Sequence, residues 1–375
     1  MALPDAAYDP FERGRFPVGV RTIEALDSGR NRLFNCEIWY PATVAHAGED
    51  LAFETQDAFS VPNRNEQRRQ AAVRNVAAER GNYPLVVFSH ASAFHRRGGT
   101  FLCTHLASHG YVVAALDHSE VVAPELSPKQ NETDEQKAAR WDEAIASRVP
   151  DVRFLLDQLV DRPLPIGGIA IDVDAIGIVG HSFGGWTALA VPEVDARIRA
   201  VVALAPAGSS KPRPGILPVK LTFAWGRDVP TLYLVAENDV ALPLSGMYEL
   251  FERTKSRKQM VVLRRADHAH FMDNVEHEHE TMRALPLPPE LAYLKNEMRP
   301  IGELCSGESA NLFVRGLAVC HLDAFLKRKR PAQDLLASNI QSELSKRSID
   351  AFLHNRRSLN RINPQNRLNG QTPIA

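Results

Sequence analysis

Several features that would place a sequence in a class at first sight are missing here. No apolar run approaches the roughly 20 residues of a membrane helix, and the N-terminus lacks the apolar core of a secretory signal. The net charge of -1 gives no electrostatic reason for a nucleic-acid partner. We therefore expect a cytoplasmic protein with no membrane span and no nucleic-acid partner. Nothing in the sequence indicates an oligomeric state.

Cysteine is also scarce. Four cysteines are scattered along the chain of 375 residues: Cys36, Cys103, Cys305 and Cys320. They show no C-x-x-C spacing and fall mostly in apolar segments, so we expect free thiols, as in a reducing compartment.

The sequence gives little support for a metal site. Histidines and glutamates alternate late in the chain: His268, His270, Glu276, His277, Glu278, His279 and Glu280. Paired histidines can bind zinc. Residues 274–283 are typical of a charged helix, however, on which residues i and i+2 point apart, and no H-E-x-x-H motif is present. We expect no metal and no cofactor.

The pattern of apolar runs predicts an α/β fold. Strand-like runs occur at 84–89, 111–116, 176–179, 199–205, 231–236 and 259–263. Helix-like segments lie between many of them, at 100–108, 141–160, 186–190 and 247–254, with breaks expected near Pro150 and Pro192. Two further runs, 18–25 and 33–40, flank turn residues and predict an antiparallel hairpin. We expect a mostly parallel central sheet with helices on both faces.

The domain organisation follows from the same pattern. We predict one domain over residues 1–330, with insertions at 42–83 and 283–309 that could form a flap or lid. The first insertion has no strand pattern, and its Ala- and Arg-rich residues 66–80 predict a helix. Residues 312–328 should form the last helix, followed by a polar, basic C-terminal tail over residues 331–375.

One short stretch carries the chemistry. The strand-like run 176–179 leads into Gly180-His181-Ser182-Phe183-Gly184, which reads G-x-S-x-G, and a helix-like segment follows. A serine between a strand and a helix is the context of a nucleophile elbow, in which the serine adopts a strained backbone conformation. The flanking glycines are expected because the chain on both sides packs too closely for side chains. Ser182 is therefore our candidate nucleophile.

A serine hydroxyl needs a histidine base, which a carboxylate orients. When the chain order is Ser, then Asp or Glu, then His, the acid follows a later strand. Asp239 lies in the loop after residues 231–236 and is our candidate acid, with Glu237 as the alternative. His268 follows residues 259–263 and is our candidate base, with His270 as the alternative.

The developing oxyanion of an acyl transfer needs hydrogen-bond donors. One expected donor is the backbone N–H of Phe183, directly after the nucleophile. The other should come from the loop after residues 85–88, where small residues allow close approach of the backbone, and we expect the N–H of Ser92. The apolar side chains of Phe94, Phe183 and Trp186 suggest a modest acyl pocket.

Three segments, 84–90, 106–115 and 180–185, resemble the platelet-activating-factor acetylhydrolase group of α/β-hydrolases and bacterial proteins of the dienelactone-hydrolase-like group. The resemblance spans roughly residues 15–330. It implies the α/β-hydrolase fold, Ser182 as nucleophile, His268 as base, the amides of Ser92 and Phe183 as oxyanion hole, and no metal. The chain departs from the acetylhydrolases by Ala91 in place of glycine. It also has no carboxylate after residues 201–204, which moves the acid to Asp239. Dienelactone hydrolases proper use a cysteine nucleophile where this chain has Ser182.

We therefore expect a serine esterase that acts on a small-molecule ester or lipid, with short acyl groups as the first guess. The alternative activity is a phospholipid sn-2 deacylase of the acetylhydrolase type, for which Arg69, Arg74 and Arg80 could meet phosphate. The alternative of another class is a non-catalytic α/β-hydrolase-like binding protein. The sequence offers a candidate for each of the three members of the triad, which argues against a non-catalytic protein.

Overall fold

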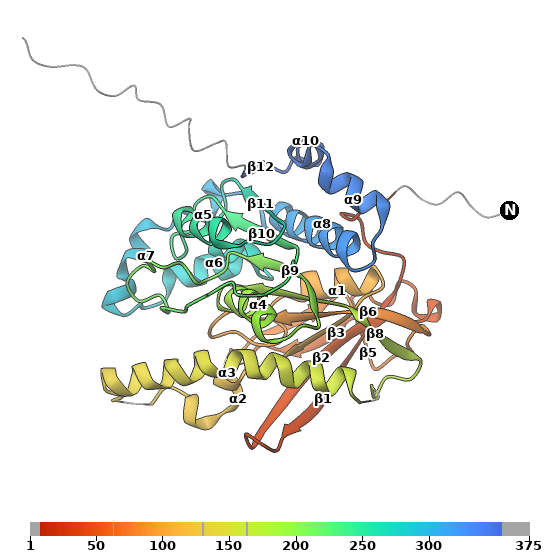
Figure 1. The fold of residues 1–375 in the computed structure, drawn as a ribbon, viewed down its shortest axis with the longest axis horizontal. Helices are drawn as coiled ribbons and strands as arrows, with labels where there is room; N and C mark the ends of the chain where they lie inside the picture. Colours follow the sequence, from red (N-terminus) through yellow and green to blue (C-terminus); the bar gives the residue numbers. More distant parts are fainter. Residues whose placement is uncertain (1–7, 63, 130, 163, 355–375) are drawn as a thin grey trace, which may run out of the picture.

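The computed structural model describes residues 8–62, 64–129, 131–162 and 164–354, and its centre is a ten-stranded sheet (Figure 1). The strands, in their order across the sheet, are β12 (Ala351–Leu353), β11 (Lys258–Leu263), β10 (Thr231–Ala236), β9 (Ile198–Leu204), β8 (Ile169–His181), β6 (Gly81–Ser89), β7 (Val112–Leu116), β2 (Arg32–Pro41), β1 (Val18–Asp27) and β5 (Val73–Arg74). The six from β11 to β7 are parallel. This is the predicted mostly parallel sheet.

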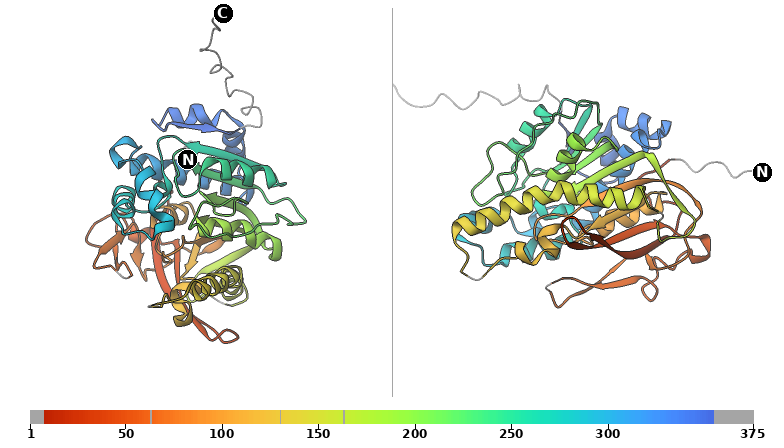
Figure 2. Two further views of the ribbon diagram at one scale, coloured as in Figure 1. Left: turned by 90° about the vertical axis from the view of Figure 1, so that its left-hand side faces the viewer. Right: turned by 60° about the horizontal axis from the view of Figure 1, so that its bottom comes forward.

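The predicted antiparallel hairpin is also present. β1 pairs with β2 from Val18↔Pro41 to Asp27↔Arg32, and β2 pairs antiparallel with β7. The tip of the hairpin projects from the body of the molecule (Figure 2). At the opposite edge of the sheet, β12 pairs antiparallel with β11.

Helices cover both faces of the sheet. The helices are α1 (Thr100–Ser108), α2 (Ser119–Val122), α3 (Asp134–Val160), α4 (Phe183–Val194), α5 (Leu244–Arg253), α6 (Val275–Ala284), α7 (Ala292–Glu297), α8 (Gly307–Phe325), α9 (Arg330–Ala337) and α10 (Ile340–Ser345). One apolar core joins α1 and α8 to one face, and a second joins α3, α4 and α5 to the other. Successive residues of β6 alternate between the cores: Val86 and Phe88 face α1, while Leu85 and Val87 face α3. In Figure 1, α3 and α8 lie on opposite sides of the sheet.

The helix predicted for residues 66–80 is wrong. The segment contains β4 (Gln67–Gln70), which pairs with β3 (Asp57–Ser60), and then β5. Partners far away in the sequence override the helix propensity: the Gln70 side chain accepts from the Trp39 indole at 2.6 Å, and Arg74 pairs with Glu37 at 2.9 Å. The expectation that residues 42–83 lack strands is therefore corrected as well.

Proline breaks helices less here than the sequence suggests. α3 is continuous through Pro150, and α4 extends two residues past Pro192. α3 also begins earlier than predicted, because Thr133 and Gln136 form a capping box at its N-terminus. A proline removes one backbone hydrogen bond, and a 27-residue helix packed against the sheet retains the others.

The predicted tail begins too early. Residues 330–353 form α9, α10 and β12, and Leu336, Leu344 and Ile349 are buried in the core on the α8 side. α8 is therefore not the last helix. Burial of these apolar residues explains why this part folds onto the domain, whereas the rest of the predicted tail, residues 355–375, lies outside the described residues.

No helix in the described ranges combines the length and the apolar character needed to cross a bilayer. The four cysteines are free, and Cys36, Cys103 and Cys320 are buried.

Candidate active site

Ser182 occupies a tight turn between β8 and α4. Its backbone lies at φ 58° and ψ -116°, a combination that non-glycine residues rarely adopt. Three backbone hydrogen bonds hold it there. Its N–H donates to Leu204 at 2.9 Å, and its carbonyl accepts from Trp186 and from Ala207, each at 3.0 Å. This is the strained strand–turn–helix arrangement expected of a nucleophile elbow.

The glycines around Ser182 are required by close backbone contacts. A Cβ atom on Gly180 would lie 2.0 Å from the carbonyl oxygen of Gly184, and one on Gly184 would lie 2.0 Å from that of Ser89. Real Cβ atoms do not approach so closely. The elbow can therefore lie against the end of β6 only because these positions lack side chains.

His268 and Asp239 are brought together by the loops after β11 and β10. The Nδ1 atom of His268 lies 2.7 Å from Oδ2 of Asp239, and both residues are buried. The other oxygen of Asp239 accepts the backbone N–H of Leu242 at 2.7 Å, which fixes the orientation of the carboxylate. The arrangement can hold an imidazole with Nε2 free to accept a proton.

The two alternative residues are engaged elsewhere. Glu237 accepts from the Arg264 side chain and from the Arg265 N–H, both at 3.1 Å. His270 contacts the Cys305 carbonyl through Nε2 at 3.1 Å and accepts the Asp267 N–H at Nδ1. The side chains of Glu237 and His270 therefore bind partners other than Asp239 and the His268 ring.

His268 lies beside the elbow. Its ring centroid is 4.7 Å from that of His181, the residue before Ser182. Among the side chains that the structure describes, the Ser182 hydroxyl makes no hydrogen bond to His268. Catalytic hydrogen bonds are often long in free enzymes and tighten when substrate binds.

Charges around His268 favour its protonated form. Burial lowers the pKa of His268, but the carboxylates of Asp239 and then Asp267 outweigh burial, so the net direction is upward. Burial, and then the neighbouring His268, hold the pKa of His181 well below its ordinary value, so His181 is neutral. The imidazole therefore has two acidic neighbours and one neutral aromatic neighbour.

Sequence reasoning missed Asp267. Its side chain accepts hydrogen bonds from the backbone N–H of His268 at 2.7 Å and from that of Val240 at 3.2 Å. Asp267 thus joins the loop after β10, which carries Asp239 (the acid loop), to the loop after β11, which carries His268 (the histidine loop). Burial, and then the charge of Asp239, raise the pKa of Asp267. Its position directly before the predicted base was the available signal.

The two predicted oxyanion donors are free of protein acceptors. The Phe183 N–H is at the start of α4, where helices leave their first amides unpaired, and Ser92 lies in the loop after β6. Within residues 8–354, leaving out 63, 130 and 163, neither amide donates to the protein. Ala93, next to Ser92, has a positive φ of 59°, so this loop is also strained.

The first insertion contacts both sides of this region. Phe59 of β3 lies against the His95 ring of the loop after β6, with centroids 6.4 Å apart. Arg64 and Arg68 pair with the buried Glu278 of α6, just beyond the His268 loop. The insertion thus connects the Ser92 loop with the segment that follows His268.

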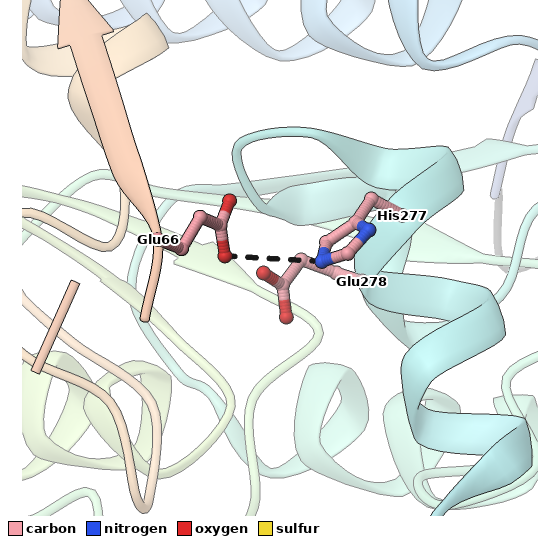
Figure 3. A group of neighbouring side chains, drawn as sticks. All are labelled: Glu66, His277 and Glu278. Atoms are coloured by element: carbon pink, nitrogen blue, oxygen red, sulfur yellow. Dashed lines mark ion pairs between the residues drawn. The ribbon is translucent and has the colours of Figure 1, made fainter. Parts of the chain in front are cut away.

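One group of possible metal ligands occurs in the described part of the chain: Glu66, His277 and Glu278. Figure 3 shows Glu66 extending from the segment before β4 toward α6, with a carboxylate oxygen 3.8 Å from Nε2 of His277. Arg68 pairs with both carboxylates, and Arg64 with Glu278 at 2.8 Å. Because arginines already neutralise these acids, the group fits an ion-pair cluster better than a cation site. His268 and His270 lie outside it.

Known proteins resemble parts of this sequence. A family model described as Chlorophyllase matches residues 54–227, just under half of the chain. The platelet-activating factor acetylhydrolase of Canis lupus familiaris is 27% identical over 51% of this chain and 48% of that protein, and that of Bos taurus is 29% identical over 32% and 34%. Chlorophyllase type 0 of Chenopodium album is 26% identical over 39% and 40%. The chain spans half or less of the length of these curated relatives.

A solved structure extends the likeness to most of the chain. The ferulic acid esterase from Streptomyces cinnamoneus superposes with a TM-score of 0.57 at 21% identity, covering 88% of this chain and 93% of that one. This likeness concerns the fold. It agrees with the mostly parallel sheet and the helices around it, and it confirms the fold inferred from the sequence. The chain therefore has the α/β-hydrolase fold, and the partial sequence matches to chlorophyllases and platelet-activating factor acetylhydrolases are consistent with it.

Proposed function

We propose that this protein is a serine hydrolase that cleaves carboxylic esters through an acyl-enzyme on Ser182. The observation that carries the proposal is the 2.7 Å contact between His268 Nδ1 and Asp239, next to a serine in a strained elbow. The relatives support the same reaction class, because their names describe an acetylhydrolase and a ferulic acid esterase.

The proposed chemistry uses groups of this chain only. Nε2 of His268 takes the hydroxyl proton as Ser182 Oγ bonds to the ester carbonyl carbon. The same proton passes to the leaving alcohol as the C–O bond breaks, and His268 then activates water to release the acid and free serine. Asp239 keeps the proton on Nδ1 and stabilises the imidazolium. The N–H groups of Ser92 and Phe183 bind the oxyanion.

Short acyl groups are the first substrates that we propose. Phe183 and Trp186, which the sequence suggested as pocket walls, stack on each other with centroids 5.4 Å apart and are buried in the core, whereas Phe94 is only half-buried. The word acetylhydrolase in the names of the relatives supports a small acyl group.

A phospholipid substrate is the second candidate, because three large apolar side chains are exposed on the first insertion: Val44, Leu51 and Phe53. Of the arginines suggested to bind phosphate, Arg74 is paired with Glu37 and Asp57, and Arg69 lies over the Phe53 ring. Comparing p-nitrophenyl acetate with a phospholipid that carries a short sn-2 acyl chain separates the two substrates. Greater kcat/KM for the phospholipid would favour the second.

The first insertion is proposed as a cover for the site. Its contacts with the Ser92 loop and with α6 support this role. The second insertion contributes Leu294 and Met298, which pack on Val240 in the acid loop. The cytoplasmic location stays a prediction.

The decisive experiment is Ser182→Ala. We expect loss of p-nitrophenyl acetate hydrolysis by more than about 10⁴-fold, with retained folding, because the nucleophile is gone. A fluorophosphonate probe should label Ser182 in the wild type and leave the variant unlabelled. Ser210→Ala, which changes an exposed serine on another loop, is the control and should be fully active. A folded wild type with neither turnover nor label would favour the non-catalytic binding protein.

A further inference from the structure

A charged side chain lies beneath the loop that carries Ser92. Arg148 of α3 is completely buried. Its Nη1 atom donates to the His90 carbonyl at 2.6 Å and to the Ser89 hydroxyl at 3.4 Å, and Nη2 reaches the Ala91 carbonyl at 3.5 Å. The guanidinium also pairs with Glu120 of α2. Arg148 therefore contacts the first residues after β6 from the inner side.

The same guanidinium contacts the side chain of Phe183, whose backbone N–H is the other proposed donor. Its central carbon lies 4.2 Å from the centre of the Phe183 ring, a cation–π contact. The N–H of Phe183 and the N–H of Ser92 are the two proposed donors. One buried cation is thus in contact with both segments that supply them.

The peptide geometry explains what this contact can do. The carbonyl of Ala91 and the N–H of Ser92 belong to one planar peptide group and point in opposite directions. A cation on the carbonyl side fixes the plane and polarises the N–H on the far side, since hydrogen bonds in a chain strengthen one another. The Ala91 carbonyl also contacts Nδ1 of His90 at 2.8 Å.

Arg148, His90, His118 and Ser89 form a buried network, in which Arg148 carries the positive charge and the two histidines are neutral. Burial and then the Arg148 charge hold the pKa values of His90 and His118 well below their ordinary range. His118 contacts Ser89 Oγ through Nε2 at 2.9 Å, and its N–H donates to Nε2 of His90 at 3.1 Å. These contacts hold the loop in place but carry no positive charge.

Packing alone does not explain a buried arginine. Burying an ion pair costs desolvation, and apolar residues of similar volume are often as stable or more stable at such positions. Nε of Arg148 and Oε2 of Glu120 have no hydrogen-bond partner among the described residues. The pair is therefore incompletely satisfied, which makes a purely stabilising role a poor account of it.

We infer that Arg148 is a positioning residue of the oxyanion hole, holding and polarising the Ser92 amide from behind while packing on Phe183. This inference rests on the proposed function of Ser182. It assigns the residue a part in stabilising the transition state, although it does not touch the substrate. Its removal should therefore lower kcat and leave KM nearly unchanged.

The test compares two variants with wild type. The first is the double variant Arg148→Met with Glu120→Gln, which removes both charges and leaves no unpaired buried carboxylate. The second is Arg148→Lys, which keeps the charge with fewer donors. For each we would measure kcat and KM with p-nitrophenyl acetate, and the inhibition constant of an aryl trifluoromethyl ketone. Ser182 Oγ adds to this ketone's carbonyl carbon, its proton passes to His268, and the carbonyl electrons form an oxyanion.

We expect kcat of the double variant to fall roughly tenfold to hundredfold, somewhat less than the loss for removing a direct donor. The inhibition constant should rise by the same factor as kcat/KM falls, because both report binding of the oxyanion. Arg148→Lys should recover part of both losses. The matched control is Arg227→Met: Arg227 also donates to backbone carbonyls, those of Pro192, Asp195 and Ile198, but at the far end of α4. It should change only the Tm.

Several results would overturn the inference. Unchanged kcat, or a lower kcat with unchanged ketone affinity, would show that Arg148 only stabilises the fold. If the double variant does not fold, Arg148→Lys is the deciding variant. Wild-type values of both kcat and the ketone inhibition constant in Arg148→Lys would also overturn the inference. Failure of the proposed function is seen separately, because wild type would then lack turnover and Ser182 labelling.

Discussion

Asp239→Asn removes a negative charge from the Nδ1 side of His268 without changing the size of the side chain. The Leu242 N–H donates to one oxygen of Asp239 at 2.7 Å, so the asparagine oxygen should stay on that side. The amide NH₂ would then face Nδ1 of His268, which in the wild type lies 2.7 Å from a carboxylate oxygen. The imidazole would have to accept there and carry its proton on Nε2, the wrong tautomer for a base.

The size of the effect can be estimated from the geometry. In the transition state His268 is an imidazolium whose charge centre lies about 4 Å from that of the carboxylate, and at an effective dielectric constant near 20 this attraction is about 4 kcal/mol. About 1.4 kcal/mol corresponds to tenfold in rate, so losing the charge costs roughly 10³-fold in kcat. The tautomer effect adds to this, and we expect a loss of about 10³- to 10⁴-fold.

Steady-state hydrolysis of p-nitrophenyl acetate measures the loss, and thermal unfolding checks that the variant is folded. Glu237→Gln is the matched control, since Glu237 is the carboxylate that the sequence left as the alternative acid. It pairs with Arg264 at 3.1 Å and should keep activity within a few-fold of wild type. The reasoning is refuted if Asp239→Asn retains a tenth or more of the activity, or if the control loses as much.

Two further predictions concern the surroundings of this pair. Asp267→Asn keeps an oxygen for the His268 N–H but removes a charge that raises the pKa of His268, so the acid limb of the kcat/KM profile should move to lower pH. A profile that stays in place, or moves to higher pH, contradicts this account. Gly184→Ala places a Cβ 2.0 Å from the Ser89 carbonyl oxygen and should lower both the Tm and turnover, with a loss of roughly 1–3 kcal/mol in stability. The control is Gly167→Ala, where an added Cβ meets nothing within 4 Å, and equal Tm values for the two variants would contradict the steric argument.

Local patterns were sufficient to predict the parallel sheet, and they also pointed to the candidate residues of the site. The strands are short apolar runs that alternate with helices, and the helix predicted for 100–108 has those bounds in the structure. The chain order of serine, acid and histidine pointed to Asp239 and His268, because each follows a strand whose end lies at one edge of the sheet. Their 2.7 Å contact agrees with that choice.

Structural features that depend on residues far apart in the sequence could not be predicted from local patterns. Residues 66–80 have helix-forming composition, yet they pair with β1, β3 and the Trp39 side chain. Arg148 occurs in a helix with many charged residues and looks like a surface residue. The available signal was its spacing, since it precedes the buried Val152 by four residues and lies on the same face of α3. The charged composition of α3 therefore suggests that Arg148 is exposed to solvent, whereas its position on the helix indicates that it is buried.

Strained residues at the ends of neighbouring strands suggest how the site is held. Four non-glycine residues with positive φ follow strands at this edge: Ala93 after β6, Ser182 after β8, Ala205 after β9 and Arg265 after β11. Such conformations cost about 1–3 kcal/mol each and persist only where the surroundings fix them.

For three of these residues, the fixing hydrogen bonds come from the neighbouring strand or its end. The Ser182 N–H donates to Leu204 of β9, the Ala205 N–H to Leu234 of β10, both at 2.9 Å, and the Arg265 N–H to the Glu237 side chain after β10. The segment expected to be a loose tail takes part too, since Asp350, just before β12, accepts the Arg264 N–H at 2.9 Å. The position of His268 therefore depends on strand pairing that extends to the end of the described chain, and burial of Leu344 and Ile349 secures that last pairing.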